Sequence, residues 1–277
     1  MTKISRSQIT GMNFHYLHYP LDYFLDSMVR YQFEQIELWG AAPHCYVEDL
    51  SLSDINRIKR NIVSRELRVV CFTPEQCMYP INLAAKEKEI RERSVRYFQK
   101  SMEASVELEA PMVLATAGWG YRNEQREEAW KRACDSLQQL AAFAEQMGVV
   151  LALEPLQRTE SNLICDLASL VEMLESIRSP SVKGMVDTVA MAVEGEEMGS
   201  YFERLQDDFL HIHFVDGKPG GHLAWGDGNL PLKSYLDTVQ KYNYSGALTL
   251  EFTSPKYLEN PDQAVEATLR QLEPYLA

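Results

Sequence analysis

Short apolar segments alternate with longer amphipathic segments from one end of the chain to the other. The apolar segments are rich in Val, Ile, Leu and Phe, which is typical of strands that are covered on both faces. Between them, the apolar residues recur with the spacing of an amphipathic helix. The pattern therefore predicts eight strands, at residues 9–14, 33–39, 68–73, 112–117, 149–154, 183–188, 209–215 and 247–252.

The helices between these strands have recognisable start and stop residues. Ser53 precedes Asp54 and is a candidate N-cap, because a Ser side chain accepts a hydrogen bond from the first helical turn. Gly148 suits a helix end, and Pro231 and Pro261 suit a first helical turn. We expect helices at 21–31, 53–65, 86–108, 124–147, 166–178, 197–206, 231–242 and 261–276.

The regular alternation of strand and helix predicts an α/β fold without a break between domains. A doubly wound sheet would need a glycine-rich phosphate loop after its first strand, where Gly11 stands alone. Eight strand–helix units in 277 residues fit a (β/α)8 TIM barrel, which typically has about 250 residues. The prediction is a single-domain TIM barrel over residues 1–277.

Composition narrows the possible partners and the compartment. The chain has 27 Lys and Arg against 40 Asp and Glu, a net charge of −13, which disfavours nucleic acid and anionic membrane surfaces. No apolar segment approaches the roughly 20 residues of a membrane-spanning helix, and the first residues lack a secretory signal. The five cysteines form no C-x-x-C pair. We therefore expect reduced thiols and a cytoplasmic location, the cysteines being Cys45, Cys71, Cys77, Cys134 and Cys165.

Ionisable residues stand at or near the ends of four consecutive predicted strands. Glu154, Asp187 and Glu251 end the fifth, sixth and eighth, and His213 lies near the end of the seventh. The carboxyl ends of barrel strands share one rim, so these side chains should meet there. Because residues two apart share a face, His211 lies one layer deeper and is expected to orient His213.

A group of carboxylates at the mouth of a barrel needs a compensating positive charge. Each one alone would be read as a solvated or capping group, but together they would repel one another in a partly dry environment. A divalent cation removes this repulsion. Three carboxylates and one imidazole form a mostly oxygen donor set, which favours Mn²⁺, Mg²⁺, Co²⁺ or Ni²⁺.

Several segments resemble the sugar isomerase/epimerase superfamily of TIM barrels, and within it the fructoselysine 3-epimerase family. They are IELWGAAPHCYVEDL (36–50), FTPEQCMYPIN (72–82), LALEPLQRTESNLICD (151–166), MVDTVA (185–190), HIHFVDGKPGGHLAWGDGNLPL (211–232) and TLEF (249–252). The resemblance implies a homo-oligomer that binds a metal through Glu154, Asp187, His213 and Glu251. It also implies interconversion of fructoselysine and psicoselysine, or of a close ketosamine or ketose, through a cis-enediolate, with Glu154 and Glu251 exchanging the C3 proton from opposite faces.

The same resemblance suggests residues that contact the sugar. For each of them a structural role, as a solvated, turn-forming or packing residue, stays open. The candidates are Glu160, Asn162, His222, Asp216, His44 and Trp119.

The chain departs from epimerases of free sugars at two positions. Those enzymes typically have a His three residues after the Asp ligand, where this chain has Ala190, and an Arg after the seventh strand, where it has only Lys218. Both differences suggest another way of holding the O1/O2 end of the substrate, such as a C1 that carries an amine.

Other functions use the same scaffold. A ketose/aldose isomerase or a keto-sugar or keto-inositol dehydratase would need the same four ligands, because a fold does not determine chemistry. A metal-dependent DNA-repair endonuclease would need a basic surface and more histidines than the six present. A sugar-binding protein without catalysis is disfavoured, because a carboxylate cluster that holds no metal ion would destabilise the fold.

Overall fold

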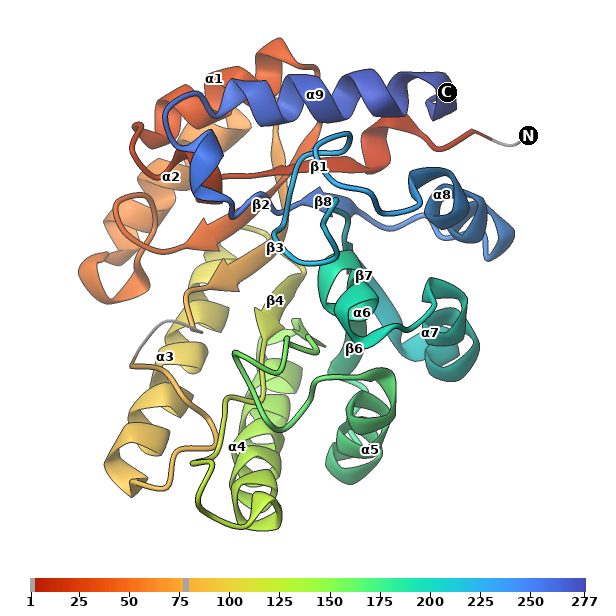
Figure 1. Ribbon diagram of the computed structural model, residues 1–277. Helices are drawn as coiled ribbons and strands as arrows, with labels where there is room; N and C mark the ends of the chain where they lie inside the picture. Colours follow the sequence, from red (N-terminus) through yellow and green to blue (C-terminus); the bar gives the residue numbers. More distant parts are fainter. Residues whose placement is uncertain (1–2, 77–79) are drawn as a thin grey trace.

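The computed structural model describes residues 3–76 and 80–277, so Cys77 lies outside the described residues. Eight parallel strands close into a barrel in sequence order, and the first strand pairs with both the second and the last. The predicted TIM barrel is therefore confirmed (Figure 1). The strands are β1 (Ile9–Met12), β2 (Gln35–Gly40), β3 (Arg68–Pro74), β4 (Met112–Ala115), β5 (Val150–Leu153), β6 (Val182–Asp187), β7 (Phe209–His213) and β8 (Leu248–Leu250).

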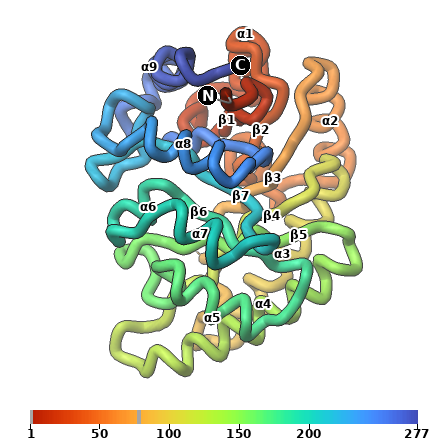
Figure 2. Tube along the Cα trace, turned by 90° about the vertical axis from the view of Figure 1, so that its right-hand side faces the viewer, coloured from red at the N-terminus to blue at the C-terminus, as the bar shows by residue number. Residues whose placement is uncertain are grey.

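Helices surround the barrel, as Figures 1 and 2 show from two directions. Their apolar faces pack against the outer side of the strands, which is why the predicted segments are amphipathic. The helices are α1 (Leu21–Arg30), α2 (Leu52–Val63), α3 (Lys88–Glu107), α4 (Arg126–Met147), α5 (Leu167–Ile177), α6 (Thr188–Glu194), α7 (Met198–Leu205), α8 (Leu232–Lys241) and α9 (Asp262–Leu272).

Some helix ends differ from the expectation. The N-cap of α2 is Ser51 rather than Ser53, because Ser51 and Asp54 each accept a hydrogen bond from the backbone N–H of the other. Pro231 and Pro261 occupy the N-cap positions of α8 and α9 rather than their first turns. Gly148 ends α4 in the left-handed conformation, as expected.

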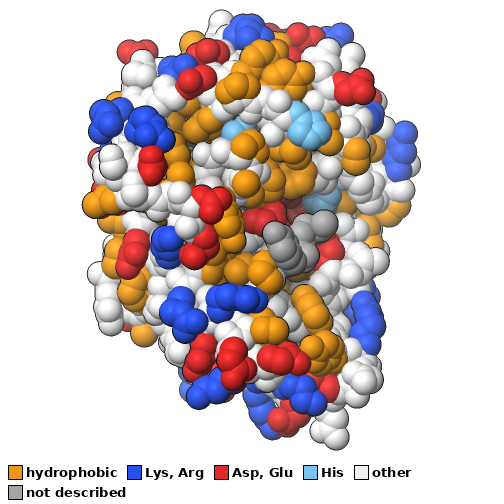
Figure 3. All heavy atoms as spheres, turned by 90° about the vertical axis from the view of Figure 1, so that its left-hand side faces the viewer, with side chains coloured by type: hydrophobic (Ala, Val, Ile, Leu, Met, Phe, Trp, Pro, Cys, Tyr) orange, Lys and Arg blue, Asp and Glu red, His pale blue; other side chains and the backbone are white. Residues whose placement is uncertain are grey.

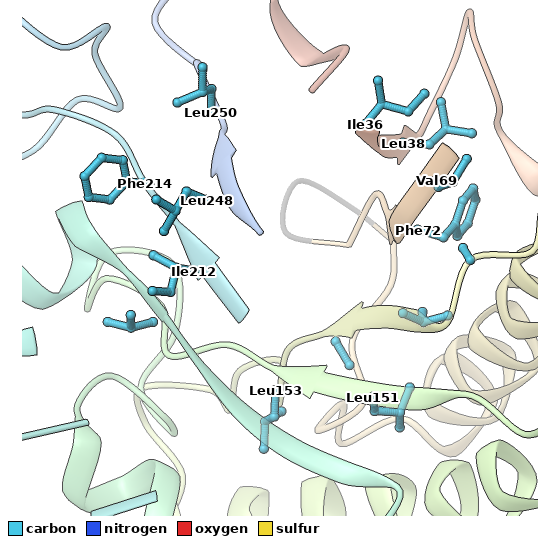
Figure 4. Close-up of a cluster of buried hydrophobic side chains, with 14 of the residues drawn as sticks. Ile36, Leu38, Val69, Phe72, Leu151, Leu153, Ile212, Phe214, Leu248 and Leu250 are labelled. Carbon is cyan, nitrogen blue, oxygen red and sulfur yellow. The ribbon is translucent and has the colours of Figure 1, made fainter. Parts of the chain in front are cut away.

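The alternation of side chains along each strand separates two kinds of environment. One set points outward and packs under the helices, and Figure 4 shows part of it on β2, β3, β5, β7 and β8. Its labelled members are Ile36, Leu38, Val69, Phe72, Leu151, Leu153, Ile212, Phe214, Leu248 and Leu250.

The alternate residues point into the barrel. A small apolar layer of Cys71, Leu114, Ala152 and Met185 fills part of the interior, and all four side chains are buried. Ala152 and Met185 precede Glu154 and Asp187 by two residues, so the apolar layer lies beneath these carboxylates, as expected. Beneath the rim the barrel interior thus holds this apolar layer together with the buried ionisable side chains of Glu37 and His211.

The surface seen from the left of Figure 1 is hollowed near its middle. Acidic and His side chains are visible there between hydrophobic ones (Figure 3). In the part of the chain that the structure describes, no helix is long and apolar enough to cross a membrane.

Candidate metal centre and sugar pocket

Four side chains from consecutive strands converge at the mouth of the barrel. Asp187 and His213 are the last residues of β6 and β7, and Glu154 and Glu251 directly follow β5 and β8. One donor atom from each lies within 4.8 Å of every other. Glu154, Asp187 and His213 are buried, and Glu251 is partly exposed. The sequence thus predicted which four residues meet, because parallel strands end at one rim.

The His213 ring lies with its Nδ1 atom toward two of the carboxylates. This nitrogen is 3.0 Å from Oε1 of Glu154 and 3.1 Å from Oε2 of Glu251. Such separations suit donor atoms that share one cation at about 2.1 Å. Glu154 and Glu251 therefore both approach the same imidazole nitrogen.

Two buried atoms of this cluster lack hydrogen bonds within the described chain. They are Nδ1 of His213 and Oδ2 of Asp187. The other oxygen of Asp187 accepts hydrogen bonds from the backbone N–H of Val189 and Ala190, at 2.8 and 2.7 Å, and so caps α6. A buried polar atom without a partner is costly. A divalent cation would satisfy both atoms, so the donor set fits a metal ion.

Glu37 of β2 holds the other side of the His213 ring. Its Oε1 lies 3.0 Å from Nε2 of His213, and its Oε2 lies 2.7 Å from Nε2 of His211. The Thr73 hydroxyl also donates to Glu37. Because a carboxylate accepts, Nε2 of His213 carries a hydrogen, and Nδ1 is the nitrogen whose lone pair would bind a cation. His211 was expected to orient His213, but Glu37 stands between the two.

Sequence reasoning missed Glu37, although a signal was present. Its neighbours Ile36 and Leu38 point outward under the helices, so Glu37 points into the barrel. A carboxylate inside a barrel strand needs a partner, and the two histidines of β7 supply one. Its pKa is lowered well below the usual range, because His213 and His211 together outweigh the opposing effect of burial.

A second group of potential ligands, Glu37, Cys71 and His211, also lies close together. Burial raises the pKa of the Cys71 thiol well above its usual range, which disfavours the thiolate that a metal requires. The hydrogen bond between Glu37 and His211 accounts for the pair without an ion. We therefore assign this group to the support of His213.

His222 brings a positive charge to the cluster from the segment after β7. Its Nε2 lies 3.4 Å from Oδ2 of Asp187 and 3.6 Å from Oε2 of Glu251. Burial on its own would lower the pKa of His222, but these carboxylates raise it to about 9. In turn His222 lowers the pKa of Asp187, against the effect of burial.

Glu154 differs from Asp187 in its protonation. Burial raises the pKa of Glu154 to about 7, although His213 acts in the opposite direction. A carboxyl group with a pKa near neutrality exchanges protons readily at the pH of the cell.

A pocket of about 460 Å³ opens above the four residues, within the range of small-molecule sites. Of the expected substrate contacts, Glu160 and His222 line it. Its other described lining residues are Phe14, Trp39, Thr73, Pro74, Glu75, Gln76, Leu114, Glu154, Pro155, Leu156, Gln157, Asp187, Ala190, Gly221, Glu251 and Thr253.

His44 and Asn162, two of the expected substrate contacts, do not line this pocket. In each of them both polar side-chain atoms form hydrogen bonds within the protein. His44 lies between the side-chain amide of Asn13 and the carbonyl of Tyr19, at 2.9 and 2.7 Å. Asn162 forms two hydrogen bonds with the backbone of Gly120, at 2.9 and 3.1 Å. Both join neighbouring loops and neither lines this pocket, so their contact with the sugar stays a prediction.

Trp119 and Asp216, the remaining expected contacts, also do not line this pocket. Trp119 is 40% exposed, and Asn82 exchanges hydrogen bonds with its backbone. Asp216 is buried and accepts four hydrogen bonds from backbone N–H groups of the segment between β7 and α8. Asp216 thus organises the segment that carries His222, which is the structural role that the sequence left open for it. Neither Trp119 nor Asp216 lines this pocket, and a contact of either with the substrate stays a prediction.

Comparison with known proteins identifies the family. The family model described as "Xylose isomerase-like TIM barrel" matches residues 25–275. The chain belongs to this family. Within the xylose isomerase-like family, it is 29% identical over 244 residues to fructoselysine 3-epimerase of Escherichia coli O157:H7, covering 87% of this chain and 88% of the relative. It is 26% identical over 176 residues to D-psicose 3-epimerase of Enterocloster bolteae, covering 61% and 57%.

Solved structures of xylose isomerase-like proteins share the fold. The apo form of 3-keto-D-glucoside 4-epimerase from E. coli superposes with a TM-score of 0.83 at 20% identity, covering 97% of this chain and all of that one. D-psicose 3-epimerase from Clostridium cellulolyticum H10, solved with D-tagatose, gives a TM-score of 0.80 at 17% identity, covering 96% and 99%. The four proteins named here are carbohydrate epimerases, and in sequence the chain resembles the two 3-epimerases among them.

Proposed function

We propose that this chain is a divalent-metal-dependent 3-epimerase that interconverts fructoselysine and psicoselysine, or a closely related ketosamine. The observation that carries the proposal is the convergence of Glu154, Asp187, His213 and Glu251 at the pocket floor, with two buried donor atoms left without partners. The donor set favours Mn²⁺, Co²⁺, Ni²⁺ or Mg²⁺.

A bound cation would stabilise the negative charge that develops on the carbonyl oxygen and the neighbouring hydroxyl oxygen of the substrate. This stabilisation makes the C3 hydrogen more acidic. The protein supplies the groups that move the proton. Glu154 and Glu251 both lie close to Nδ1 of His213 and line the pocket, so both carboxylates are within reach of one bound sugar, and one of them removes the C3 proton on one face. The other carboxylate returns a proton from the opposite face, through a cis-enediolate of the substrate.

The neighbours of Asp187 and His213 support this division of labour. The carboxylate of Asp187 is held ionised by His222 and by the backbone of α6, so it serves as a fixed negative ligand. Glu37 fixes the ring of His213 from behind.

The choice of a ketosamine rests on three observations. The relative of Escherichia coli O157:H7, at 29% identity, is named fructoselysine 3-epimerase. Ala190 and Gly221 line the pocket with little side-chain bulk, which leaves room for a substituent on C1. No Lys or Arg occurs among the described lining residues, so the pocket suits a cationic substrate. Glu160 and His222 remain the candidate contacts for sugar hydroxyls.

Two further parts of the proposal follow from the resemblance and the composition. We expect a homo-oligomer, which sedimentation analysis of the purified protein tests. We also expect a cytoplasmic location and no nucleic-acid partner, in keeping with the net charge of −13.

Hydrogen exchange with solvent tests the reaction. The metal-loaded protein is incubated with fructoselysine in D₂O, the metal is then removed, and the sugar is analysed by NMR. Deuterium at C3 with the carbonyl still at C2, together with psicoselysine, is the expected result. A carbonyl moved to C1 would identify an isomerase, and loss of water would identify a dehydratase. Either of these results would overturn the proposal.

A further inference from the structure

The wall of the pocket formed by β1, β2 and β3 contains an aromatic pair beside a carboxylate. The rings of Phe14 and Trp39 lie with their centroids 4.5 Å apart at an interplanar angle of 46°. The indole Nε1–H of Trp39 donates a hydrogen bond to Oε2 of Glu75 at 3.1 Å. All three residues line the pocket. Glu75 therefore presents its carboxylate in an orientation that Trp39 fixes.

This wall lies on a different part of the rim from the metal candidates. Phe14 and Glu75 follow β1 and β3, and Trp39 is the penultimate residue of β2. The four convergent donors come instead from β5 to β8 or directly follow these strands. A sugar held at the donors would direct its remaining substituent into the rest of the pocket. The aromatic wall and Glu75 form part of that space.

The pocket carries more negative charge than one divalent cation offsets. Its lining includes five carboxylates, and the only basic side chain among the described lining residues is His222. Three carboxylates belong to the group of four donors, while Glu75 and Glu160 lie outside it. Excess negative potential in a partly enclosed pocket attracts a cationic ligand.

An oriented carboxylate beside aromatic side chains is suited to an ammonium group. The ring quadrupole attracts the cation, and the carboxylate forms a charge-assisted hydrogen bond with its N–H groups. Trp39 is only 9% exposed, so a group seated there would be partly shielded from water, which strengthens both interactions. A neutral hydroxyl would gain from the hydrogen bond but not from the excess charge.

We propose that Glu75, with Trp39 and Phe14, forms a subsite that binds the ammonium group of an amine-substituted ketose. This inference rests on the proposed function, because it assumes that a ketose occupies the convergent donors. The subsite makes the protein prefer a ketosamine to the corresponding unsubstituted ketose. It assigns Glu75 as a residue that determines specificity.

Glu75→Gln tests the subsite with little change in shape. The glutamine side-chain oxygen still accepts the hydrogen bond from Trp39, but the negative charge is gone. Dissociation constants of fructoselysine and of fructose are measured by calorimetry on metal-loaded wild-type and variant proteins. We expect the preference for fructoselysine over fructose to fall about tenfold, as for a charge-assisted hydrogen bond that is lost.

Two further variants keep the test decisive. Trp39→Phe removes the N–H that orients Glu75 and should lower the same preference, so it replaces Glu75→Gln if that variant does not fold. Glu160→Gln removes the other carboxylate outside the four donors. A loss of preference in Glu160→Gln alone, or an equal weakening of both ligands in Glu75→Gln, would overturn the subsite.

The binding test of the subsite and the hydrogen-exchange test of the proposed function give independent answers. If wild-type protein exchanges the C3 hydrogen of fructoselysine while Glu75→Gln retains the full preference, the subsite is wrong and the epimerase stands. If wild-type protein prefers fructoselysine, Glu75→Gln loses that preference, and no C3 hydrogen is exchanged, then the subsite is correct and the proposed epimerase activity is wrong.

Discussion

The ring of His213 has a different partner on each of its two nitrogens. Nε2 donates to Glu37, deep in the barrel, while Nδ1 faces Glu154 and Glu251 at the pocket floor. The partner on one nitrogen thereby determines where the lone pair of the other points. Glu37 thus fixes a hydrogen on Nε2 of His213, which leaves Nδ1 as the atom that would bind a metal ion.

Glu251→Gln tests the proton transfer at the level of one residue. The amide keeps an oxygen that can face a cation but cannot accept the C3 proton. We expect exchange at C3 to fall by about 10²–10⁴-fold, with the fold intact, as measured by deuterium incorporation and circular dichroism. Glu259→Gln, at an exposed position outside the pocket lining, is the matched control. Wild-type exchange in Glu251→Gln would remove the mechanism.

Glu37→Gln tests the support of His213. The amide group cannot accept hydrogen bonds from both histidines at once, so the ring of His213 loses its fixed protonation. We expect the affinity for Mn²⁺ to fall by about 10–100-fold in calorimetric titrations of the folded variant. Glu34→Gln, at an exposed position just before β2, should bind Mn²⁺ as the wild type does. Unchanged affinity in Glu37→Gln would refute the positioning role.

At the scale of elements, loops after the strands bring polar groups to the pocket and hold them by backbone hydrogen bonds. The segment between β7 and α8 is the most elaborate case. Asp216 accepts from the N–H groups of Gly217 and Leu230 with Oδ1, and from Gly226 and Gly228 with Oδ2. One carboxylate thus ties together the segment that carries His222.

Asp216→Asn should loosen that segment. The amide nitrogen of asparagine replaces one acceptor oxygen and faces two backbone N–H groups. We expect a loss of about 3 kcal/mol in the free energy of unfolding by urea, as for hydrogen bonds to a charged group. Asp237→Asn, which breaks an exposed ion pair with Lys233, should cost less than about 0.5 kcal/mol. Equal effects in the two variants would contradict this account.

The sequence predicted those features that depend on local pattern. Strand alternation and strand ends sufficed to bring Glu154, Asp187, His213 and Glu251 together, because every barrel strand ends at one rim. The positions of His44 and Asn162 depend instead on backbone groups 25 and 42 residues away along the chain. No local pattern reveals those partners, so a contact with the sugar was the expectation for both residues.

The helix α6 shows a similar limit. It begins at Thr188, directly after β6, where the sequence pattern indicated only the end of a strand. Oδ1 of Asp187 caps this helix, while Oδ2 remains available at the cluster. One side chain therefore serves both the fold and the candidate site, and sequence reasoning found only the second role.

At the scale of the whole molecule, the concentration of charge in the barrel mouth links metal binding to pH. In the folded chain the pKa of His222 is raised to about 9, so its stabilising charge is present below about 6.5 and lost as the pH rises toward 9. Glu154, with a pKa raised to about 7, holds a proton that the unfolded chain releases near 4.5. Both effects make the chelated protein less stable as the pH rises.

Melting curves at about pH 5.5, 7 and 8.5, with chelator and with Mn²⁺, test this link. A metal replaces the lost protons, so the increase in Tm on adding Mn²⁺ should grow with pH. His222→Gln should reduce the pH dependence above neutrality in chelator, and His18→Gln, at an exposed position, should not. An increase in Tm that shrinks as the pH rises would contradict the assignment.

We infer that four donors from four strands bind a single divalent ion. Anomalous diffraction from crystals grown with Mn²⁺ or Co²⁺ locates that ion. We expect one strong peak within about 2.0–2.6 Å of a carboxylate oxygen from each of Glu154, Asp187 and Glu251 and of Nδ1 of His213. A peak bound elsewhere, or none at this position in metal-rich crystals, would contradict it.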